Sequence, residues 1–300
     1  MRSITRIIEY SSRADEFTIH PLADIHFGAA ACDEKRLSER FGEIDADPLA
    51  LWLLLGDQLD SIGHKDPRFD ISSLPRWLVL RWHESGKLGL AQHQRNELAE
   101  RINAHATLGD KLLAVVEGNH EAMIRKHQDI DTYLSLIERI DRGNAERLAL
   151  GVSGFVTLRF RRMVGEDGTR TKGSTFTVVL YLHHGWGGGD LAGGINLKLE
   201  RQMDRYGADV YLMGHHHKVT THTNPGVIQP NSAGRIEQGA DKLGAVCAPF
   251  LRCMVDGSDT YSEAKAYRAA PASADILIRV RPDKHEVDLV ERSRREAMLL

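Results

Sequence analysis

Three consecutive histidines, His215, His216 and His217, follow an apolar run over residues 210–213 and a single glycine. The apolar run predicts a short β-strand, and Gly214 lets the backbone turn where the strand ends. Because alternate residues of an extended chain point the same way, His215 and His217 can face one cavity. Two imidazoles that converge at a strand end are typical of a metal site. A solvated histidine cluster in a loop explains this one segment equally well.

Four other strand-like segments also end in residue types that bind metal ions. These segments cover residues 17–23, 49–55, 111–117 and 176–182. The residues that follow them are, in chain order, Asp24 and His26, Asp57, Asn119 and His120, and His184. Each set alone has an ordinary explanation, such as a helix cap, a turn or a surface histidine. Five sets that all follow β-like runs would require five coincidences of type and position, so we infer one shared site.

Two of the five sets contain adjacent candidates. Asn119 and His120 cannot both point at the same atom from a regular strand, so one can bind metal while the other faces the substrate. His183 and His184 are also adjacent, and we expect His184 to point into the site because it directly precedes a glycine. Asp60 can cap a helix or orient a neighbouring ligand.

The candidate ligands supply imidazole, carboxylate and one amide oxygen, without thiolate. This set suits divalent ions such as Mn, Fe, Zn, Ni or Co, of which we expect Mn. The candidates outnumber the ligands of a closed structural zinc site and are enough for two ions that share one carboxylate. Two ions about 3.5–4 Å apart can activate a shared water and hold the oxygens of a phosphoryl group during in-line displacement.

The ordered series D-x-H, G-D-x-x-D, G-N-H-E, H-G and G-H-x-H, over residues 24–217, resembles the calcineurin-like metallophosphoesterase superfamily. The run before the triple histidine is similar to prophage and bacterial members. The resemblance implies a four-layer α/β/β/α sandwich with the site at the carboxyl ends of the strands. The residues that would hold the first ion are Asp24, His26, Asp57 and His217. The residues that would hold the second are Asp57, Asn119, His184 and His215.

The resemblance also implies a catalytic role for His120, which would protonate the leaving oxygen after attack by a metal-bridging hydroxide. A histidine titrates in the range that this role requires. Asp60 resembles the carboxylate that pairs with this histidine and orients it.

The chain departs from one subgroup of this superfamily. Its phosphoprotein phosphatases place Arg and then Gly directly after the second Asp, where this chain has Ser61 and Ile62. We therefore expect a phosphodiesterase that acts on nucleotide or nucleic-acid diesters. The alternatives are a phosphomonoesterase and a non-catalytic scaffold with the same fold. A scaffold would have lost ligands or the acid histidine, whereas this chain keeps all of them.

Composition limits the class of protein. The chain has 300 residues, 42% hydrophobic and 27% charged, as in an ordinary globular protein. The net charge of −3 shows that the chain as a whole is not a basic nucleic-acid binder, although a local basic groove is compatible with it. Three cysteines without a C-x-x-C pair argue against a disulfide framework.

Without a signal-like apolar segment or a run of 18 apolar residues, we expect a cytoplasmic protein with no membrane contact. Nothing in the sequence indicates an oligomeric state.

The elements that position the candidate residues read as one α/β domain over residues 1–300. Amphipathic helices are expected over 33–45 and 193–206, and a mostly helical insertion is expected over about 61–110. Residues 218–260 read as irregular. The C-terminal region of about 218–292 is therefore expected to hold an irregular segment followed by a hairpin.

Overall fold

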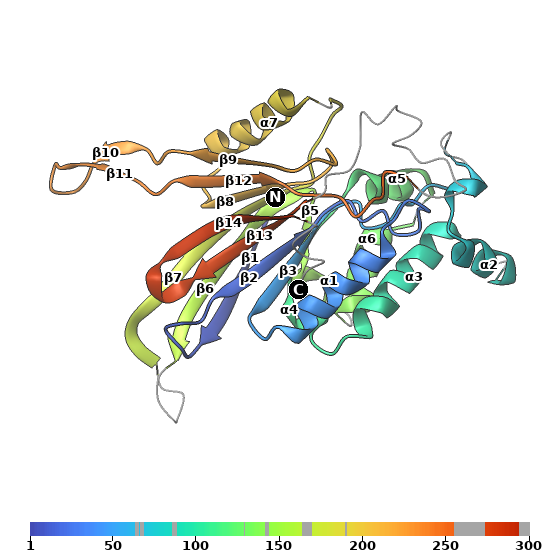
Figure 1. Ribbon diagram of the computed structural model, residues 1–300, viewed down its shortest axis with the longest axis horizontal. Coiled ribbons are helices and arrows are strands. Elements are labelled where there is room, and N and C mark those ends of the chain that lie inside the picture. Colours follow the sequence, from blue (N-terminus) through green and yellow to red (C-terminus); the bar gives the residue numbers. More distant parts are fainter. Residues whose placement is uncertain are drawn as a thin grey trace.

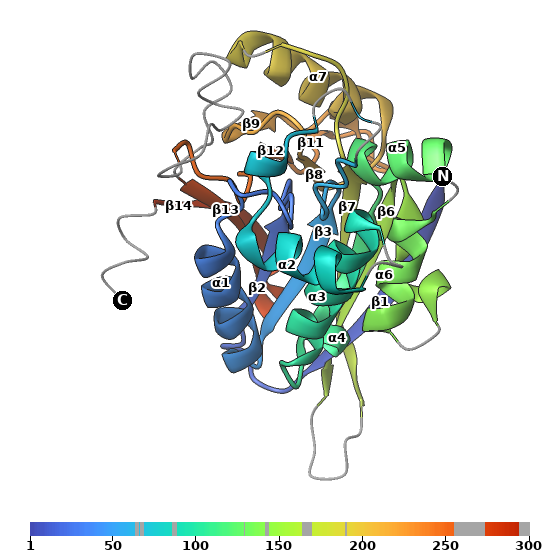
Figure 2. The same ribbon diagram turned by 90° about the vertical axis from the view of Figure 1, so that its right-hand side faces the viewer.

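Two six-stranded sheets lie face to face in the part of the chain that the computed structural model describes, with helices on their outer faces (Figure 1, Figure 2). The described residues are 1–63, 66, 69–85, 89–128, 130–141, 144–163, 170–189, 191–254 and 274–293.

The first sheet carries the strands that lead to the first three candidate sets. In spatial order it consists of β14 (Glu286–Ser293), β13 (Ala274–Arg281), β2 (Phe17–Leu22), β3 (Ala50–Leu55), β4 (Leu112–Val116) and β5 (Ala149–Gly151). The strands β2, β3, β4 and β5 are parallel, so β2, β3 and β4 end at the same edge of the sheet. β3 and β4 are nearly continuous apolar runs because both of their faces are covered.

The second sheet carries the strands that lead to the other two candidate sets. In spatial order it consists of β1 (Arg2–Tyr10), β6 (Ser153–Met163), β7 (Arg170–His183), β8 (Val210–Met213), β12 (Lys242–Val246) and β9 (Thr220–Asn224). β7 and β8 are parallel, and His183 is paired with Met213, so these two strands end side by side. The consecutive strands β1 and β2 belong to different sheets, so the turn between them crosses from one sheet of the sandwich to the other.

Helices close the sandwich on both sides. α1 (Glu34–Ala46), α3 (Leu90–Asn103) and α6 (Thr132–Ile140) pack on the first sheet, and α7 (Ala192–Arg205) packs on the second. Each helix turns an apolar stripe inward, as Leu37, Phe41 and Ile44 do in α1. Apolar side chains of the two inner sheet faces form the central core. This order of layers confirms the predicted four-layer α/β/β/α sandwich.

The remaining helices are α2 (Arg76–Ser85), α4 (Leu108–Lys111) and α5 (Asn119–Gln128), and 3₁₀ helices cover Ile71–Ser73, Ala145–Arg147 and Pro282–Lys284. The span between β3 and β4 therefore contains α2, α3 and α4. No helix in the described part of the chain combines the length and the apolar character needed to cross a membrane.

The prediction of an irregular segment after the triple histidine is wrong for residues 218–254. This stretch contains β9, β10 (Ile228–Pro230), β11 (Ile236–Gln238) and β12. β9 is an edge strand made of Thr, His and Asn, so it lacks the apolar alternation that predicts a strand. β10 and β11, which lie between β9 and β12 in the chain, pair with each other and extend away from the body as an arm (Figure 1). β13 and β14 pair as an antiparallel hairpin.

Candidate metal centre

The candidate ligands lie at the carboxyl ends of strands from both sheets, which is where open α/β sheets place their sites. Contacts between donor atoms join residues that are up to 193 positions apart in the chain, as for Asp24 and His217. The structure brings together every residue that the sequence assigned to the site: Asp24, His26, Asp57, Asp60, Asn119, His120, His184, His215 and His217.

Asp24, His26 and His217 form the first group of donors. The Nε2 atoms of His26 and His217 are 3.3 Å apart, and Nε2 of His217 is 3.8 Å from Oδ1 of Asp24. Asp57 reaches this group from β3, with its Oδ2 3.9 Å from Nε2 of His26. Imidazole nitrogens this close to one another and to two carboxylates are arranged as ligands of one cation.

Asp57, His184 and His215 form the second group. Nε2 of His184 is 3.3 Å from Oδ2 of Asp57 and 3.1 Å from Oδ1 of Asn119. The ring centroids of His184 and His215 are 5.2 Å apart. Because Oδ2 of Asp57 approaches both groups, its carboxylate lies where a bridging ligand would have to be.

Main-chain carbonyls orient two of the imidazoles. Nδ1–H of His184 donates to the carbonyl of Leu55 at 2.8 Å, and Nε2–H of His215 donates to the carbonyl of Gly187 at 3.0 Å. A carbonyl oxygen only accepts, so these ring nitrogens must carry the proton. When such a ring is neutral, its opposite nitrogen has a lone pair available for a cation, which is the usual outer-sphere arrangement around a metal-binding histidine.

The two central carboxylates are buried. Asp24 is 0% exposed and accepts the backbone N–H of His215, and Asp57 is 2% exposed and accepts the backbone N–H of His120 through Oδ1. Buried carboxylates are costly unless positive charge compensates them. The donor set therefore fits divalent metal ions.

The shifted pKa values of the site residues reflect the negative charge that these carboxylates concentrate in the site. Burial lowers the pKa of His26, but the hydrogen bond to Asp60 and the charge of Asp57 outweigh it and raise the pKa to about 9. Burial also lowers the pKa of His184, but the charge of Asp57 and a hydrogen bond to it raise the pKa to about 10. Burial raises the pKa of Asp24 to about 6. Groups that favour the positive charge of a histidine will favour a metal cation in the same place.

The ligand loops have an uncommon backbone conformation. Seven non-glycine residues among those described have positive φ, and only His285 of them lies outside the site. The other six are Asp24 (48°), His26 (47°), Asp57 (50°), Ser61 (54°), His215 (71°) and His217 (54°). Such strain persists where the surrounding structure holds it, and it concentrates at functional sites.

This conformation corrects the sequence argument about the triple histidine. His215 and His217 do not alternate along an extended chain, because both are in the left-handed region. Their side chains fall into the two different donor groups, His217 with Asp24 and His215 with Asp57.

Gly118 permits the close approach of two ligand loops. A Cβ atom at this position would lie 2.0 Å from the backbone nitrogen of Asp57 and 2.1 Å from its Oδ1. No side chain fits there, so the loop that follows β4 can pack directly on the loop that follows β3 only with glycine.

His120 and Asn119 occupy the first turn of α5 rather than a strand end. The helical turn lets Asn119 face His184 while the ring of His120 faces Asp60. Nδ1–H of His120 donates to the main-chain carbonyl of Asp60, and Nε2 of His120 is 4.0 Å from Oδ2 of Asp57. Burial lowers the pKa of His120, and the charge of Asp57 partly offsets this effect.

Asp60 contacts His120 through a different group from the one that the sequence predicted. The expected carboxylate contact is replaced by a contact with the carbonyl, and the carboxylate Oδ1 instead lies 3.5 Å from Nδ1 of His26. The positive φ of the following residue, Ser61, turns the peptide so that the carbonyl faces the histidine. Sequence spacing contains no information about this peptide orientation.

Glu121 is a buried residue of the site to which the sequence analysis gave no role. Its Oε1 accepts the N–H of Leu59 at 2.9 Å, and its Oε2 accepts the N–H of Gly118 at 3.1 Å. Burial, together with the charge of Asp57, raises its pKa to about 7. Glu121 thus connects the loops that follow β3 and β4. The sequence signal that could have identified Glu121 is its position as the last residue of the motif G-N-H-E.

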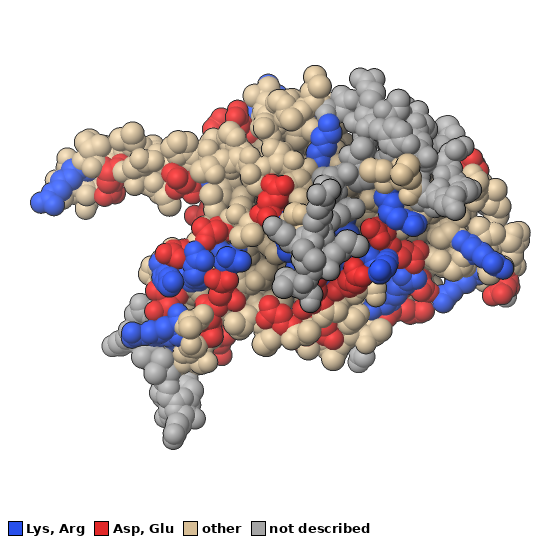
Figure 3. Space-filling model, viewed as in Figure 1, with Lys and Arg blue, Asp and Glu red and all other residues tan. Residues whose placement is uncertain are grey.

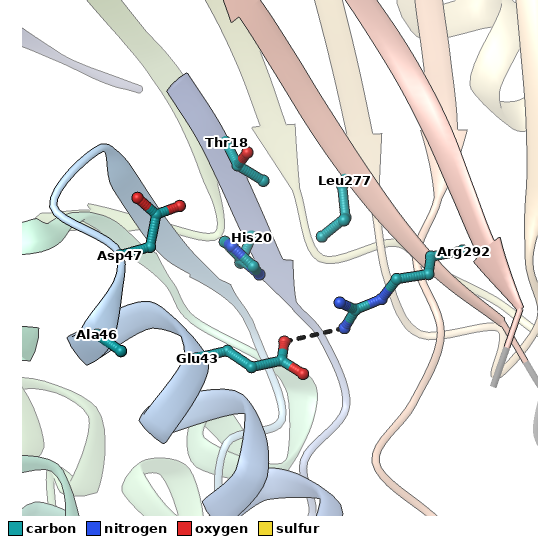
Figure 4. A pocket seen from close by; sticks show the side chains of 7 residues that line it. All are labelled: Thr18, His20, Glu43, Ala46, Asp47, Leu277 and Arg292. Carbon is teal, nitrogen blue, oxygen red and sulfur yellow. Dashed lines mark hydrogen bonds and ion pairs between the residues drawn. The ribbon is translucent and has the colours of Figure 1, made fainter. Parts of the chain in front are cut away.

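A hollow of about 420 Å³ lies apart from the candidate ligands, between α1, β2 and β14 (Figure 4). Its lining residues are Thr18, His20, Glu43, Ala46, Asp47, Leu277 and Arg292. Glu43 and Arg292 form an ion pair of 3.0 Å at its edge. None of the candidate ligands lines this hollow, so it is not part of the metal centre.

No protein family and no curated protein sequence matches this chain. Solved structures with a similar fold include a single-mutant Vps29 from Entamoeba histolytica, which is 12% identical, with 92% of this chain and 99% of that chain covered and a TM-score of 0.36. A metallophosphoesterase from Sphaerobacter thermophilus is 14% identical, with 92% and 88% covered and a TM-score of 0.36. The Pseudomonas putida nuclease MPE is 14% identical, with 91% and 87% covered and a TM-score of 0.28.

At such low identities and TM-scores, similarity does not assign a function. A function for this chain must therefore be argued from the residues of its own site.

Proposed function

We propose that this protein is a hydrolase that uses two divalent metal ions to cleave phosphate esters, with nucleotide or nucleic-acid phosphodiesters as its preferred substrates. One observation carries the proposal. Oδ2 of Asp57 lies 3.9 Å from Nε2 of His26 and 3.3 Å from Nε2 of His184, between two groups of buried donors. A carboxylate shared by two such groups is characteristic of two-ion sites. The motif series that resembles the calcineurin-like metallophosphoesterases supports the same function.

The donor groups divide into two ligand sets. The first set is Asp24, His26, Asp57 and His217. The second set is Asp57, Asn119, His184 and His215. Imidazole with carboxylate and amide oxygen suits Mn, which we expect, and also Fe, Zn, Ni or Co. When bound, the ions would supply the Lewis acidity that activates water and neutralises charge on the phosphoryl group.

The role of His120 in this proposal is to give a proton to the leaving oxygen. The carbonyl of Asp60 holds Nδ1–H, so Nε2 is the ring nitrogen that remains for the substrate. Nε2 is directed toward the shared carboxylate of Asp57, at 4.0 Å, and thus toward the region where the ester would bind. An alkoxide with a high pKa needs this proton, whereas an activated aryl oxide leaves without much help.

The preference for diesters rests on the residues that follow Asp60. Ser61 and Ile62 stand where the related protein phosphatases have Arg and Gly, and Ser61 is buried against α3. A phosphomonoester carries more negative charge than a diester and gains more from a guanidinium partner. The lack of an arginine at this position favours the diester.

The charge of the surface bears on the size of the substrate. On the face drawn in Figure 3, basic and acidic side chains of the described residues are interspersed rather than gathered into one basic lane. A protein that holds a long duplex by its phosphates would need such a lane. Small diesters and nucleotides, which need no such lane, are the first substrates to test.

The deciding experiment compares an aryl phosphodiester with the matching monoester, with Mn²⁺ and with a chelator. We expect chelator-sensitive turnover that favours the diester. Asp57→Asn should abolish this turnover and reduce the bound metal, whereas Asp131→Asn should change neither, because Asp131 caps α6 and Asn caps equally well. Monoester preference would indicate a phosphatase. Bound metal without turnover of either ester would contradict hydrolysis of simple esters and support the scaffold alternative.

A further inference from the structure

Gln94 is a fully buried polar side chain in α3, the helix of the insertion that packs closest to the site loops. Its Oε1 accepts the N–H of Ser61 at 2.9 Å, and its Nε2 donates to the carbonyl of Gly28 at 3.4 Å. Ser61 directly follows Asp60, and Gly28 lies two residues after His26. Gln94 therefore connects α3 with both loops that surround the first donor group.

The bond to Ser61 acts on the same peptide unit that contacts His120. The N–H of Ser61 and the carbonyl of Asp60 belong to one planar trans peptide, in which these two groups point in opposite directions. Gln94 accepts a hydrogen bond from the N–H of this peptide, and Nδ1–H of His120 donates a hydrogen bond to its carbonyl oxygen. The peptide between Asp60 and Ser61 is thus held between the insertion helix and the histidine.

The observed orientation of this peptide is strained. Ser61 has a φ of 54°, which an L-residue other than glycine adopts only at a cost. Rotation of the peptide plane would relieve this strain by returning φ to negative values, and it would turn the carbonyl of Asp60 away from His120. In the observed orientation, the buried N–H of Ser61 is satisfied by Gln94. Without that acceptor, the N–H would favour the rotated state, because a buried unpaired donor is unfavourable.

The geometry points to Gln94 as a positioning residue for His120: it holds the Asp60–Ser61 peptide in its strained orientation, so that the Asp60 carbonyl fixes the proton and the direction of the His120 ring. This inference rests on the proposed function, because its catalytic consequence requires His120 to protonate the leaving group. It also gives the 61–110 insertion a part in the reaction, since α3 supplies this contact from outside the ligand loops.

The test uses Gln94→Met, which has nearly the same volume but neither accepts from Ser61 nor donates to Gly28. The matched control is Arg95→Met, one residue along α3, which removes the 3.0 Å bond from Arg95 Nη1 to Ser135 Oγ and loosens the contact with α6 instead. Should Gln94→Met fail to fold, Gln94→Asn makes the same test, because its amide is one methylene too short to reach Ser61.

Three quantities are measured on the metal-loaded full chain, with diamagnetic Zn²⁺ in place of Mn²⁺ for the NMR measurement, because paramagnetic Mn²⁺ would broaden the signals of the site. They are turnover of a diester with a poor leaving group, turnover of an activated aryl diester, and the ¹⁵N–¹H NMR signal of the His120 Nδ1–H, assigned by its loss in His120→Gln. We expect Gln94→Met to lose about tenfold or more on the poor leaving group and much less on the activated ester, since loss of acid catalysis acts selectively. The metal content should equal that of the parent protein, and the Nδ1–H signal should shift or broaden. Arg95→Met should match the parent in all three.

Equal losses on both esters, a fall in bound metal, or an unchanged Nδ1–H signal in Gln94→Met would overturn the inference. The NMR signal does not depend on turnover. If the parent protein hydrolyses neither ester, the proposed function fails, while a changed signal in Gln94→Met would still establish the positioning contact.

Discussion

The main-chain carbonyl of Asp60, and not its carboxylate, accepts the Nδ1–H of His120. The carboxylate lies 3.5 Å from Nδ1 of His26, on the side of the first donor group. One residue thus serves two histidines through two different chemical groups. Substitution of the side chain should separate the two contacts, because it leaves the carbonyl in place.

Asp60→Asn should therefore weaken metal binding more than acid catalysis. Loss of the carboxylate beside His26 should lower the affinity of the first ion by about tenfold, as for other groups that orient a ligand. The ratio of turnover between esters with poor and activated leaving groups should stay unchanged. Metal titration by calorimetry and steady-state kinetics measure the two effects. A leaving-group-selective loss at unchanged metal affinity would mean that the carboxylate orients His120 after all.

His120→Ala should keep its metal ions and lose turnover. The hydrogen bond of residue 120 to Asp57 is made by the backbone N–H, which alanine retains. On esters with poor leaving groups the loss should be roughly 10²–10⁴-fold, the range of a general acid. On an activated aryl ester the loss should be much smaller. Equal losses on both kinds of ester would exclude the general-acid role.

Gly118→Ala should disturb the site, whereas Gly42→Ala should not. A Cβ at Gly118 would lie 2.0 Å from the backbone nitrogen of Asp57, so the shared carboxylate must move, and the protein should lose about 1–3 kcal/mol of stability along with bound metal. Gly42 lies inside α1 with nothing within 4 Å of its Cβ position, so alanine there should add about 0.5–1 kcal/mol. Chemical denaturation and metal analysis test both. Normal metal content in Gly118→Ala would contradict the close packing of the two loops.

His20 should make the fold sensitive to mild acid. It lines the hollow between α1, β2 and β14 (Figure 4). It accepts a hydrogen bond from Arg40 at 3.2 Å. Burial, and then the charge of Arg40, lowers its pKa to about 3. Because the unfolded chain binds this proton at a pKa of about 6.5, stability is complete above that pH and falls as the pH drops toward 3. The expected loss between pH 7.5 and 4.5 is about 2 to 3 kcal/mol from this group.

His20→Gln checks this prediction, since Gln can still accept from Arg40 but does not titrate. Urea denaturation at pH 7.5 and 4.5, in the presence of chelator, should show a smaller loss in the variant than in the parent protein. The chelator removes the contribution of metal release, which both proteins share. The same pH dependence in both proteins would show that His20 is not the group responsible.

The sequence by itself determined which strands lead to the site and what chemistry they bring. The apolar run over 210–213 was predicted and is observed as β8, because a strand buried on both faces must be apolar throughout. The convergence of the histidine and carboxylate residues could be inferred because parallel strands end at a common edge. The polar strand β9 was missed, since an edge strand has no such constraint on its composition.

Only the tertiary structure decided how the collected residues are used. The left-handed backbone at His215 and His217 divides them between two donor groups, and neither spacing nor residue type encodes that conformation. The peptide orientation at Asp60 and Ser61 depends on Gln94, which is 33 residues away in the chain. Local periodicity reflects burial and secondary structure, whereas strained loops exist only when distant parts of the fold stabilise them. The positions of the ligands were therefore readable in the sequence, and the family resemblance already divided them into two sets. The backbone conformation that separates His215 from His217 and the support of His120 were not readable there.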